Sequence, residues 1–416
     1  MSGISKVPRQ RLVLAILLAT WASVGHALTF DEALSIAEDR ASELKGRQNT
    51  VIAARAARVS AGELPDPKLV MGVDNLPVQG SEAWNSTRDF MTMQRIGVMQ
   101  EITNGDKRDA ARRLAEANVA RAGAELEIER LAVRRQTLLA WLRVYFLQQQ
   151  RALLDEIDSE NHLLDTAVTA RLASGQGKGG DSLQYRQEVI ALEDRRDDLE
   201  QNMAKARADL ARWVGPAANA PLTGSPPAYA PSPEHLRHDL DRHPDLAVFT
   251  VQEASAQAEV AMAEAAKKSD WGVELDYQHR GPAFGDMVSV QFTFDLPVFA
   301  QSRQNPQIAA RQQELERVSA ERETMVRKHT AELESMLAEQ GTLARQIERI
   351  NREWLPLGQQ KLDLTLAAYR AGREPLTTVL EARRFLIDTR MKRIDLEARR
   401  TAVETELRYL SEEIQP

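Results

Sequence analysis

A strict alternation of apolar and polar residues over residues 271–296 is the clearest pattern in the chain. Because side chains alternate between the two faces of a strand, a period of two predicts strands with one apolar and one polar face. The apolar positions, on either side of a turn at Gly281-Pro282, are Trp271, Val273, Leu275, Tyr277, Val288, Val290, Phe292, Phe294 and Leu296. The polar positions include Glu274, Asp276, Gln278, Ser289, Gln291 and Thr293. Such a hairpin suits a soluble sheet or a membrane barrel with a watery lumen.

A weaker alternation over residues 68–102 predicts a first hairpin. Leu69, Met71 and Val73 form its first strand, and a polar loop leads to a second strand over residues 89–102. A helix from about residue 29 to residue 62, with Thr29 as N-cap, precedes this hairpin and ends at Leu64-Pro65-Asp66-Pro67.

After the first hairpin the apolar spacing changes to steps of three and four, which is the helical period. Residues 107–172 lack proline, and a single helix of this length would extend roughly 100 Å. It ends at a glycine-rich tip, about residues 173–182, where Asp181 and Ser182 can cap a return helix to about residue 214.

The second half of the chain repeats this plan, which is the most specific signal in the sequence. A helix over residues 244–267 precedes the hairpin at about 271–299, a long helical segment over residues 303–369, a tip at about 370–379 and a return helix. Aligning the two tip glycines, Gly175 and Gly372, places Leu183 on Leu380 and Arg186 on Arg383. Pro356 is expected to kink or restart the second long helix.

These boundaries predict two structural repeats, residues 28–214 and 244–416. Between them, residues 215–243 contain six of the prolines and predict an irregular segment.

The first 27 residues have the pattern of a cleaved secretory signal. Lys6, Arg9 and Arg11 precede an apolar run over residues 12–24, which ends at a small-x-small site, Gly25-His26-Ala27. The run is short for a membrane span, so a retained anchor is the lesser alternative. Later in the chain no stretch approaches about 18 apolar residues, so we expect any entry into a membrane to use the strands.

Composition argues against several functional classes. The net charge of −7 in 416 residues is spread along the chain without a basic face, which disfavours nucleic-acid binding. The chain has no cysteine, which excludes disulfides, thiolate chemistry and lipidation through cysteine. No Ser/His/Asp or H-E-x-x-H arrangement is present, so we expect neither an enzyme nor a cofactor.

Two groups of possible metal ligands carry little weight. His235, His238 and His243 lie in the proline-rich segment without a surrounding acidic or thiol framework, and their spacing fits no known zinc motif. We interpret them as residues of a solvated linker. The first hairpin contains Met71, Met91, Met93 and Met99, for which packing is a commoner role than Cu(I) binding. The sequence therefore predicts no metal site.

Two hairpins supply four strands, whereas closed membrane barrels begin at about eight. If the apolar face meets lipid, several chains must pool their hairpins, since lipid cannot satisfy open sheet edges. With long helices continuing below the strands, the assembly would be a conduit across the periplasm.

The whole mature chain resembles the TolC family of outer-membrane efflux proteins. The duplicated plan, the Leu64-Pro65-Asp66-Pro67 segment, and Tyr369-x-x-Gly372 followed by residues 379–382 (Val-Leu-Glu-Ala) carry this resemblance. It implies a trimeric, 12-stranded β-barrel in the outer membrane, continued by a periplasmic α-helical barrel that meets a periplasmic adaptor and an inner-membrane pump. Residues 74–78 and 95–101 look most like the branch that serves heavy-metal resistance-nodulation-division pumps.

The resemblance also implies a gate at the tips. Tyr369 would hydrogen-bond Asp181 of a neighbouring helix pair, and Glu381 would belong to an acidic ring, although Asp181 could simply cap its helix and Glu381 could be a solvated carboxylate. Arg373 is displaced by one position from the basic residue of some relatives, and Thr378 stands where relatives often have Asp. The adaptor would contact both tips, through Gly175, Leu183, Gly372 and Leu380.

The sequence as a whole thus predicts a mainly α protein with a β-barrel part. Its predicted function is a passive exit duct for heavy-metal cations. A duct for drugs or other small molecules is one alternative, and a soluble periplasmic coiled-coil adaptor or scaffold is another. Hairpins in both halves favour the duct, because an adaptor would not need them.

Overall fold

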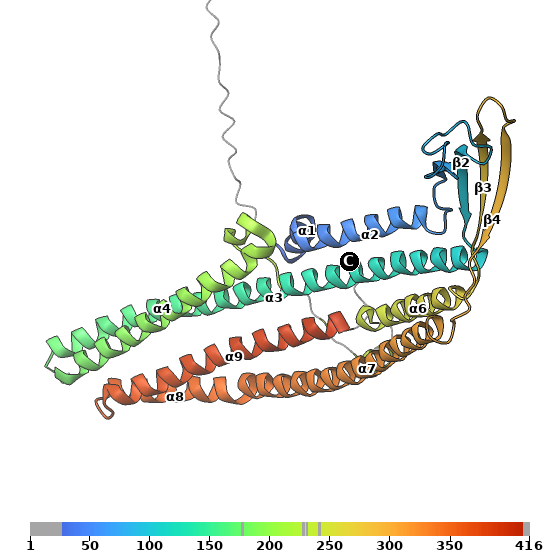
Figure 1. Cartoon of the computed structure of the whole chain (residues 1–416). Helices are drawn as coiled ribbons and strands as arrows, with labels where there is room; N and C mark the ends of the chain where they lie inside the picture. The colour runs from blue at the N-terminus through green and yellow to red at the C-terminus, as the bar shows by residue number, and fades with distance from the viewer. Residues whose placement is uncertain (1–26, 176–178, 227–228, 230–231, 240–242, 411–416) are drawn as a thin grey trace, which may run out of the picture.

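The computed structural model describes residues 27–175, 179–226, 229, 232–239 and 243–410, so the predicted signal segment lies outside the described residues except for its last position. Within this part, the molecule is elongated, with a small sheet at one end and two helical tips at the other (Figure 1). Helices dominate, and four strands supply the only sheet of the described residues.

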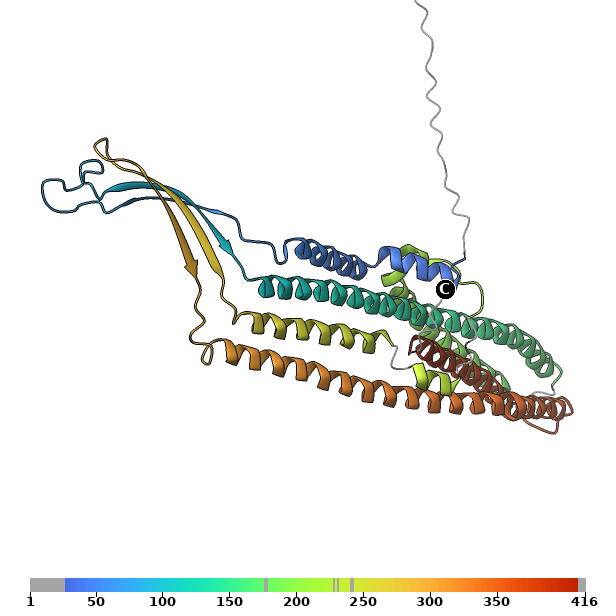
Figure 2. The same ribbon diagram turned by 90° about the vertical axis from the view of Figure 1, so that its right-hand side faces the viewer.

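Two similar sets of elements follow one another along the chain. The first set is α1 (Phe30–Arg40), α2 (Ser42–Ser60), β1 (Lys68–Asp74), β2 (Met93–Ile102), α3 (Gly105–Ala173) and α4 (Gly179–Val214). The second is α6 (Pro244–Ala265), β3 (Trp271–His279), β4 (Met287–Phe294), α7 (Gln304–Arg349), α8 (Leu355–Arg370) and α9 (Leu376–Leu410). Figure 2 shows the strands curving away from the roughly parallel helices.

The single N-terminal helix expected from the sequence is wrong, because the chain forms two helices that meet at Ala41. Thr29 caps α1 through a reciprocal arrangement in which Glu32 bonds back to the backbone N–H of Thr29. Ala41 leaves the helical region, with ψ near 112°. Around this bend Ala37, Ala41 and Leu44 all pack against Val133 of α3. The break lets both helices follow the surface of α3.

The described residues of the proline-rich segment include helical turns, where the sequence predicts an irregular path. The segment contains a 3-10 helix at Gly215–Asn219 and the short helix α5 (Pro233–Asp239). Leu236 of α5 is fully buried against Leu333 of α7 and Leu407 of α9. Burial of the Leu236 side chain therefore anchors α5 to α7 and α9.

The second long helical segment changes type just before Pro356. A π-helical turn, Ile350–Trp354, joins α7 to α8, and Pro356 lies in the first turn of α8. Proline has no N–H to donate to the carbonyl of Arg352, and its ring crowds that carbonyl. The wider π turn accommodates both effects at the position where the sequence predicts a kink.

The four strands form one antiparallel sheet in the order β1-β2-β3-β4. The central pairing of β2 with β3 joins the two repeats, with Ile102 opposite Trp271 and Gln94 opposite His279. Since β1 and β4 are the outer strands, the sheet of one chain has two open edges.

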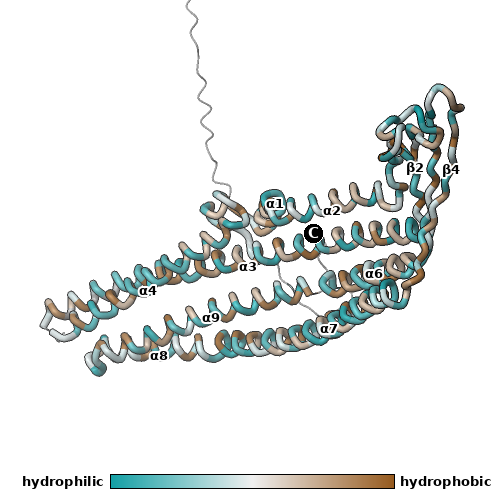
Figure 3. The backbone as a smooth tube through the Cα atoms, viewed as in Figure 1, coloured by the Kyte–Doolittle hydropathy of each residue, from teal (hydrophilic) through white to brown (hydrophobic). Residues whose placement is uncertain are grey.

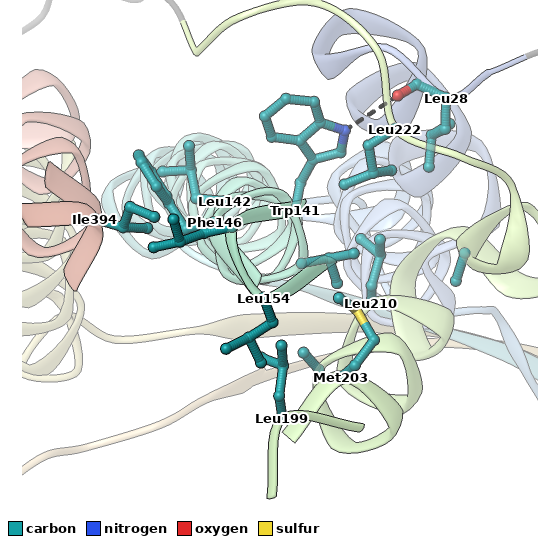
Figure 4. Packing of buried hydrophobic residues seen from close by; sticks show 14 of the residues in the cluster. Leu28, Trp141, Leu142, Phe146, Leu154, Leu199, Met203, Leu210, Leu222 and Ile394 are labelled. Carbon is teal, nitrogen blue, oxygen red and sulfur yellow. Dashed lines mark hydrogen bonds between the residues drawn. The ribbon is translucent and has the colours of Figure 1, made fainter. Parts of the chain in front are cut away.

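The largest buried cluster of the described residues lies around Trp141, near the middle of α3, and Figure 4 shows its packing. The Trp141 side chain is 0% exposed, stacks on Tyr145, meets the edge of Phe30, and donates a hydrogen bond from Nε1 to the carbonyl of Leu28 at 3.3 Å. Along the rest of the molecule, apolar and polar residues alternate closely on every helix (Figure 3). Smaller buried clusters among the described residues join the helices elsewhere along the molecule.

None of the described helices has both the length and the apolar character needed to cross a membrane.

Candidate functional site

Both tips turn through a glycine in the left-handed region. Gly175 follows α3 and Gly372 follows α8, each with φ of 72°, a conformation that other residues adopt at a cost. The N–H of Gly372 donates to the carbonyl of Tyr369 at 2.9 Å, and that of Gly175 donates to Leu172 at 3.1 Å. The two repeats therefore end their long helices in the same way.

The second tip, between α8 and α9, packs on α3 of the same chain. Tyr369, Leu376, Val379 and Leu380 form a buried cluster with Val168 of α3. This cluster holds α8 and α9 against α3 close to the tips.

The predicted gate residues differ in exposure. Asp181, in the first turn of α4, and Tyr369 are both buried, whereas Arg373 and Glu381 are exposed. The Thr378 hydroxyl donates a hydrogen bond to Glu374 Oε2 at 3.2 Å. The hydrogen bond between Tyr369 and Asp181 of a neighbouring helix pair stays a prediction, as do the gate and adaptor roles of all these residues.

Residues that match between the repeats lie in different environments. Leu380 is 6% exposed within the tip cluster, whereas Leu183 at the corresponding place in the first repeat is 62% exposed. Arg383 is 8% exposed, and its counterpart Arg186 is exposed. The first tip thus leaves its leucine side chain exposed, and the second buries the leucine at the corresponding position.

Arg383 is the functional candidate that the sequence reasoning missed. From α9 its guanidinium donates to Asn161 Oδ1, to the carbonyl of Ile157 at 3.0 Å and to Glu160 Oε2 at 3.2 Å, all three on α3. Tyr185 of α4 donates to the carbonyl of the same Asn161 at 3.2 Å. Asn161 therefore connects three helices above the tips. A signal existed, because Arg383 lies on the apolar stripe formed by Leu376, Val379, Leu380 and Leu386.

Above this point, polar pairs join α9 to α3 and α4. They are Arg384 with Glu188, Arg195 with Asp388, Arg390 with Glu156, and Gln150 with Asp395. Most of their side chains are well exposed, so each pair contributes at most about 1 kcal/mol.

At the other end of the molecule, one face of the sheet is apolar and exposed. Cross-strand register places the side chains of this face together, since Leu69 lies opposite Val98, Val98 opposite Leu275, and Leu275 opposite Val290. The exposed apolar residues are Leu69, Met71, Val73, Ile96, Val98, Trp271, Leu275, Tyr277, Val288, Val290, Phe292 and Phe294. A continuous patch of this kind marks a surface for lipid or another protein.

The opposite face is polar and centred on Arg95. Its guanidinium lies 3.5 Å from Asp74, 3.6 Å from Glu274 and 3.9 Å from Asp276. The predicted polar positions Gln278, Ser289, Gln291 and Thr293 share this face. Sequence reasoning missed the role of Arg95, although it is the lone arginine of the four strands.

Asp276 is only 2% exposed because it lies over Gly97. A Cβ at position 97 would be 2.0 Å from Asp276 Oδ1 and 2.8 Å from the carbonyl oxygen of Leu275. Glycine here is needed for space and not for backbone conformation.

Gly97→Ala is therefore expected to weaken the pairing of β2 with β3 by about 1–3 kcal/mol, as overpacking does elsewhere. Circular dichroism during heating would measure this as a lower midpoint for the loss of strand signal. Gly72→Ala is the matched control, since Gly72 shares the same face and a Cβ there meets open space. Equal midpoints for the two variants would contradict the assignment.

The structure changes the interpretation of one possible metal ligand, His243. His235 and His238 are exposed on α5, but the solvated-linker interpretation is wrong for His243, which is buried at the start of α6. Of the methionines, Met71 lies on the apolar face of the sheet and Met93 and Met99 on the polar face. These thioethers therefore do not converge.

Comparisons with known proteins agree with this geometry. Residues 236–411 match the sequence profile described as "Outer membrane efflux protein". No curated protein matches the chain.

Solved structures of low sequence identity share the fold. CusC, whose crystal structures concern transmembrane channel formation, is 16% identical with a TM-score of 0.77, covering 92% of each chain. A membrane protein from Pseudomonas aeruginosa is 16% identical with a TM-score of 0.78, covering 92% of this chain and 93% of its own. The MtrE outer membrane channel of Neisseria gonorrhoeae is 14% identical with a TM-score of 0.72, covering 92% and 88%.

The family match covers the second repeat, and the shared fold extends over both repeats. Residues 236–411 are therefore similar to outer membrane efflux proteins, and the fold of the described chain is that of solved outer membrane channels.

Proposed function

We propose that three copies of this chain form the exit duct of a tripartite efflux system. The observation that carries the proposal is the sheet, with its exposed apolar face and two open edges, at the end of very long helices. Helix α3 alone has 69 residues, which correspond to about 100 Å. Lipid tolerates an apolar sheet only when every edge is paired.

Three chains would satisfy the edges by pairing β4 of one with β1 of the next. Four strands from each of three chains make a closed barrel of about twelve strands, within the range of membrane barrels. The apolar face would then meet lipid, and Glu274, Asp276, Gln278, Ser289, Gln291 and Thr293 would line the lumen.

The helices would continue this tube into the periplasm as an α-helical barrel. Its tips would meet a periplasmic adaptor and, through it, an inner-membrane pump that supplies the energy. The exposed Leu183 and the glycine turns offer a docking surface at the tips. The chain itself would conduct passively, after export by its signal segment.

Heavy-metal cations are the proposed cargo. The local resemblance of residues 74–78 and 95–101 supports this choice, as does the charge of the polar sheet face. That face has four carboxylates, Asp74, Glu101, Glu274 and Asp276, against Lys68 and Arg95. Excess negative charge in a lumen concentrates cations. A drug duct would need no such excess.

Fractionation of cells tests the duct against the rival periplasmic adaptor. A duct is expected in outer-membrane fractions as an oligomer that dissociates to monomers only on heating. Recovery as a soluble periplasmic monomer would exclude it. For the cargo, deleting the gene should lower tolerance to metal salts and leave tolerance to organic antibiotics unchanged; the reverse pattern would favour the drug duct.

Glu381→Gln is expected to reduce cation selectivity at the tips. The exposed carboxylate on the first turns of α9 would recur once per chain around the entrance, and its removal lowers the local negative potential. Conductance of purified oligomers in planar bilayers, recorded in salts of different cations, measures this effect. Glu374→Gln, in the turn before α9, is the comparison variant. Unchanged selectivity in Glu381→Gln would mean that Glu381 is an ordinary solvated side chain.

A further inference from the structure

A buried histidine cluster lies where α6, α7 and the end of α9 meet, far from the sheet and the tips. His243 and Asp245 begin α6, and His329 lies on α7. Figure 1 shows the start of α6 beside the C-terminal end of α9. We propose that His243, Asp245 and His329 bind one divalent transition-metal ion per chain, with Zn²⁺ as the best-suited ion.

The distances fit a site that is close to its bound geometry. One ligand atom from each residue lies within 4.8 Å of the other two. Asp245 Oδ2 lies 3.6 Å from His329 Nε2 and 3.8 Å from His243 Nδ1. In a tetrahedral zinc site with bonds of about 2.0–2.2 Å, ligand atoms are roughly 3.3 Å apart. Small side-chain rotations would therefore close the site.

The ring nitrogens of the buried His329, unpartnered in the described part of the chain, point to a ligand. Its residue is 6% exposed, and neither ring nitrogen has a hydrogen-bond partner among the described residues. Buried polar atoms without a partner are rare, because burial removes their hydration. A metal on Nε2 would resolve this, and Glu332 Oε2, at 3.6 Å from Nδ1, would accept the remaining N–H.

The second imidazole is already held in the tautomer that a metal requires. His243 Nε2 lies 2.9 Å from the carbonyl of Tyr409, which can only accept, so Nε2 carries the proton. Nδ1 then presents its lone pair toward the cluster, where it accepts from the N–H of Asp245 at 3.1 Å. Metal ligands commonly donate their other ring N–H to a carbonyl or carboxylate in this way. A metal would replace the bond to the partly exposed Asp245 N–H.

The surrounding charge is compatible with a cation. Arg135 of α3 brings a positive charge near His243. Glu406 of α9 forms an ion pair with this arginine at 3.3 Å and so offsets its charge. Asp245 and Glu332 add negative charge at the cluster. Burial lowers the pKa of the His243 imidazole.

The donor set selects the class of metal. Two imidazoles with one carboxylate suit Zn²⁺, Ni²⁺, Co²⁺ or Cu²⁺, whereas Mg²⁺ and Ca²⁺ prefer oxygen ligands alone. Water would fill the fourth position. The bound ion would tie α6 to α7, with Tyr409 of α9 held as an outer partner. This site does not depend on the proposed cargo or on conduction.

Titration of the full-length protein tests the site. After chelator treatment and dialysis, isothermal titration calorimetry with Zn²⁺ is expected to give one ion per chain. His329→Gln and the nearly isosteric Asp245→Asn should each weaken binding at least tenfold. The control variant, His235→Gln with His238→Gln, removes two exposed histidines of α5 and should bind as the original chain does.

A second measurement keeps the test independent of folding defects. Co²⁺ bound to the original chain should produce the intense visible bands of four-coordinate cobalt, and Zn²⁺ should displace them. Circular dichroism identifies the variants that retain helix content. Absence of stoichiometric binding, full binding by folded His329→Gln, or loss of binding in the α5 control would each overturn the proposal.

Discussion

Trp141→Ala is expected to produce the largest loss of stability of any single substitution, about 3–5 kcal/mol in the free energy of unfolding. The indole is 0% exposed and packs between Phe30 and Tyr145. Truncation leaves a cavity and removes the hydrogen bond from Nε1 to Leu28. Because this cluster joins α1, α3 and α4, its loss affects the helices on both sides.

Thermal unfolding of the detergent-solubilised protein, followed by circular dichroism, measures this effect. Trp354→Ala is the matched control, since Trp354 is 45% exposed in the π-helical turn and its truncation should cost under about 1 kcal/mol. Trp141→Phe should fall between the two, because it retains most of the apolar volume and loses the N–H. Similar midpoints for Trp141→Ala and Trp354→Ala would contradict the central role of this cluster.

Arg383→Met is expected to loosen the attachment of α9 to α3 and to lower the free energy of unfolding by about 3 kcal/mol. The substitution removes three hydrogen bonds from a charged donor, each worth about 1.5–3 kcal/mol, although such losses do not add in full. Asn161 Oδ1 and the carbonyl of Ile157 would lose the donor that approaches them from α9. Methionine fills a similar volume, so the effect reports the polar contacts.

Hydrogen exchange of residues 376–390 measures the loosening directly, and the conductance of purified oligomers measures its consequence for the tips. We expect faster exchange and a larger mean conductance. Arg383→Lys should give an intermediate result, because an ammonium keeps the charge but cannot reproduce the fork of guanidinium donors. Arg186→Met removes the matching arginine of the first repeat, which is exposed, and should change neither quantity. Equal effects at both positions would refute the special role of Arg383.

The comparison between these two arginines illustrates how far sequence reasoning can reach. The repeat alignment pairs positions 186 and 383, and the apolar stripe around Arg383 indicates burial. Whether a stripe is buried, however, depends on which helix lies against it. Asn161 of α3 accepts a hydrogen bond from Arg383 of α9, whereas Arg186 of α4 is exposed, so the same residue type has two roles.

The local patterns of the sequence determined the elements themselves. A period of two specifies strands, steps of three and four specify helices, and a glycine after a long helix specifies the tips, because each signal depends on neighbours within a few residues. The long helices and the antiparallel hairpins are confirmed by the structure. The second strand is shorter than predicted, since residues 89–92 form turns before β2 begins at Met93.

Contacts between residues far apart in the sequence were decided only by the tertiary structure. The pairing of β2 with β3 lays Asp276 over Gly97, and the meeting of α6 with α7 places His329 beside residues more than 80 positions earlier. The break at Ala41 and the burial of Leu236 likewise follow from packing on other helices. Local sequence signals cannot specify such contacts, because their free energy arises only when distant segments exclude water together.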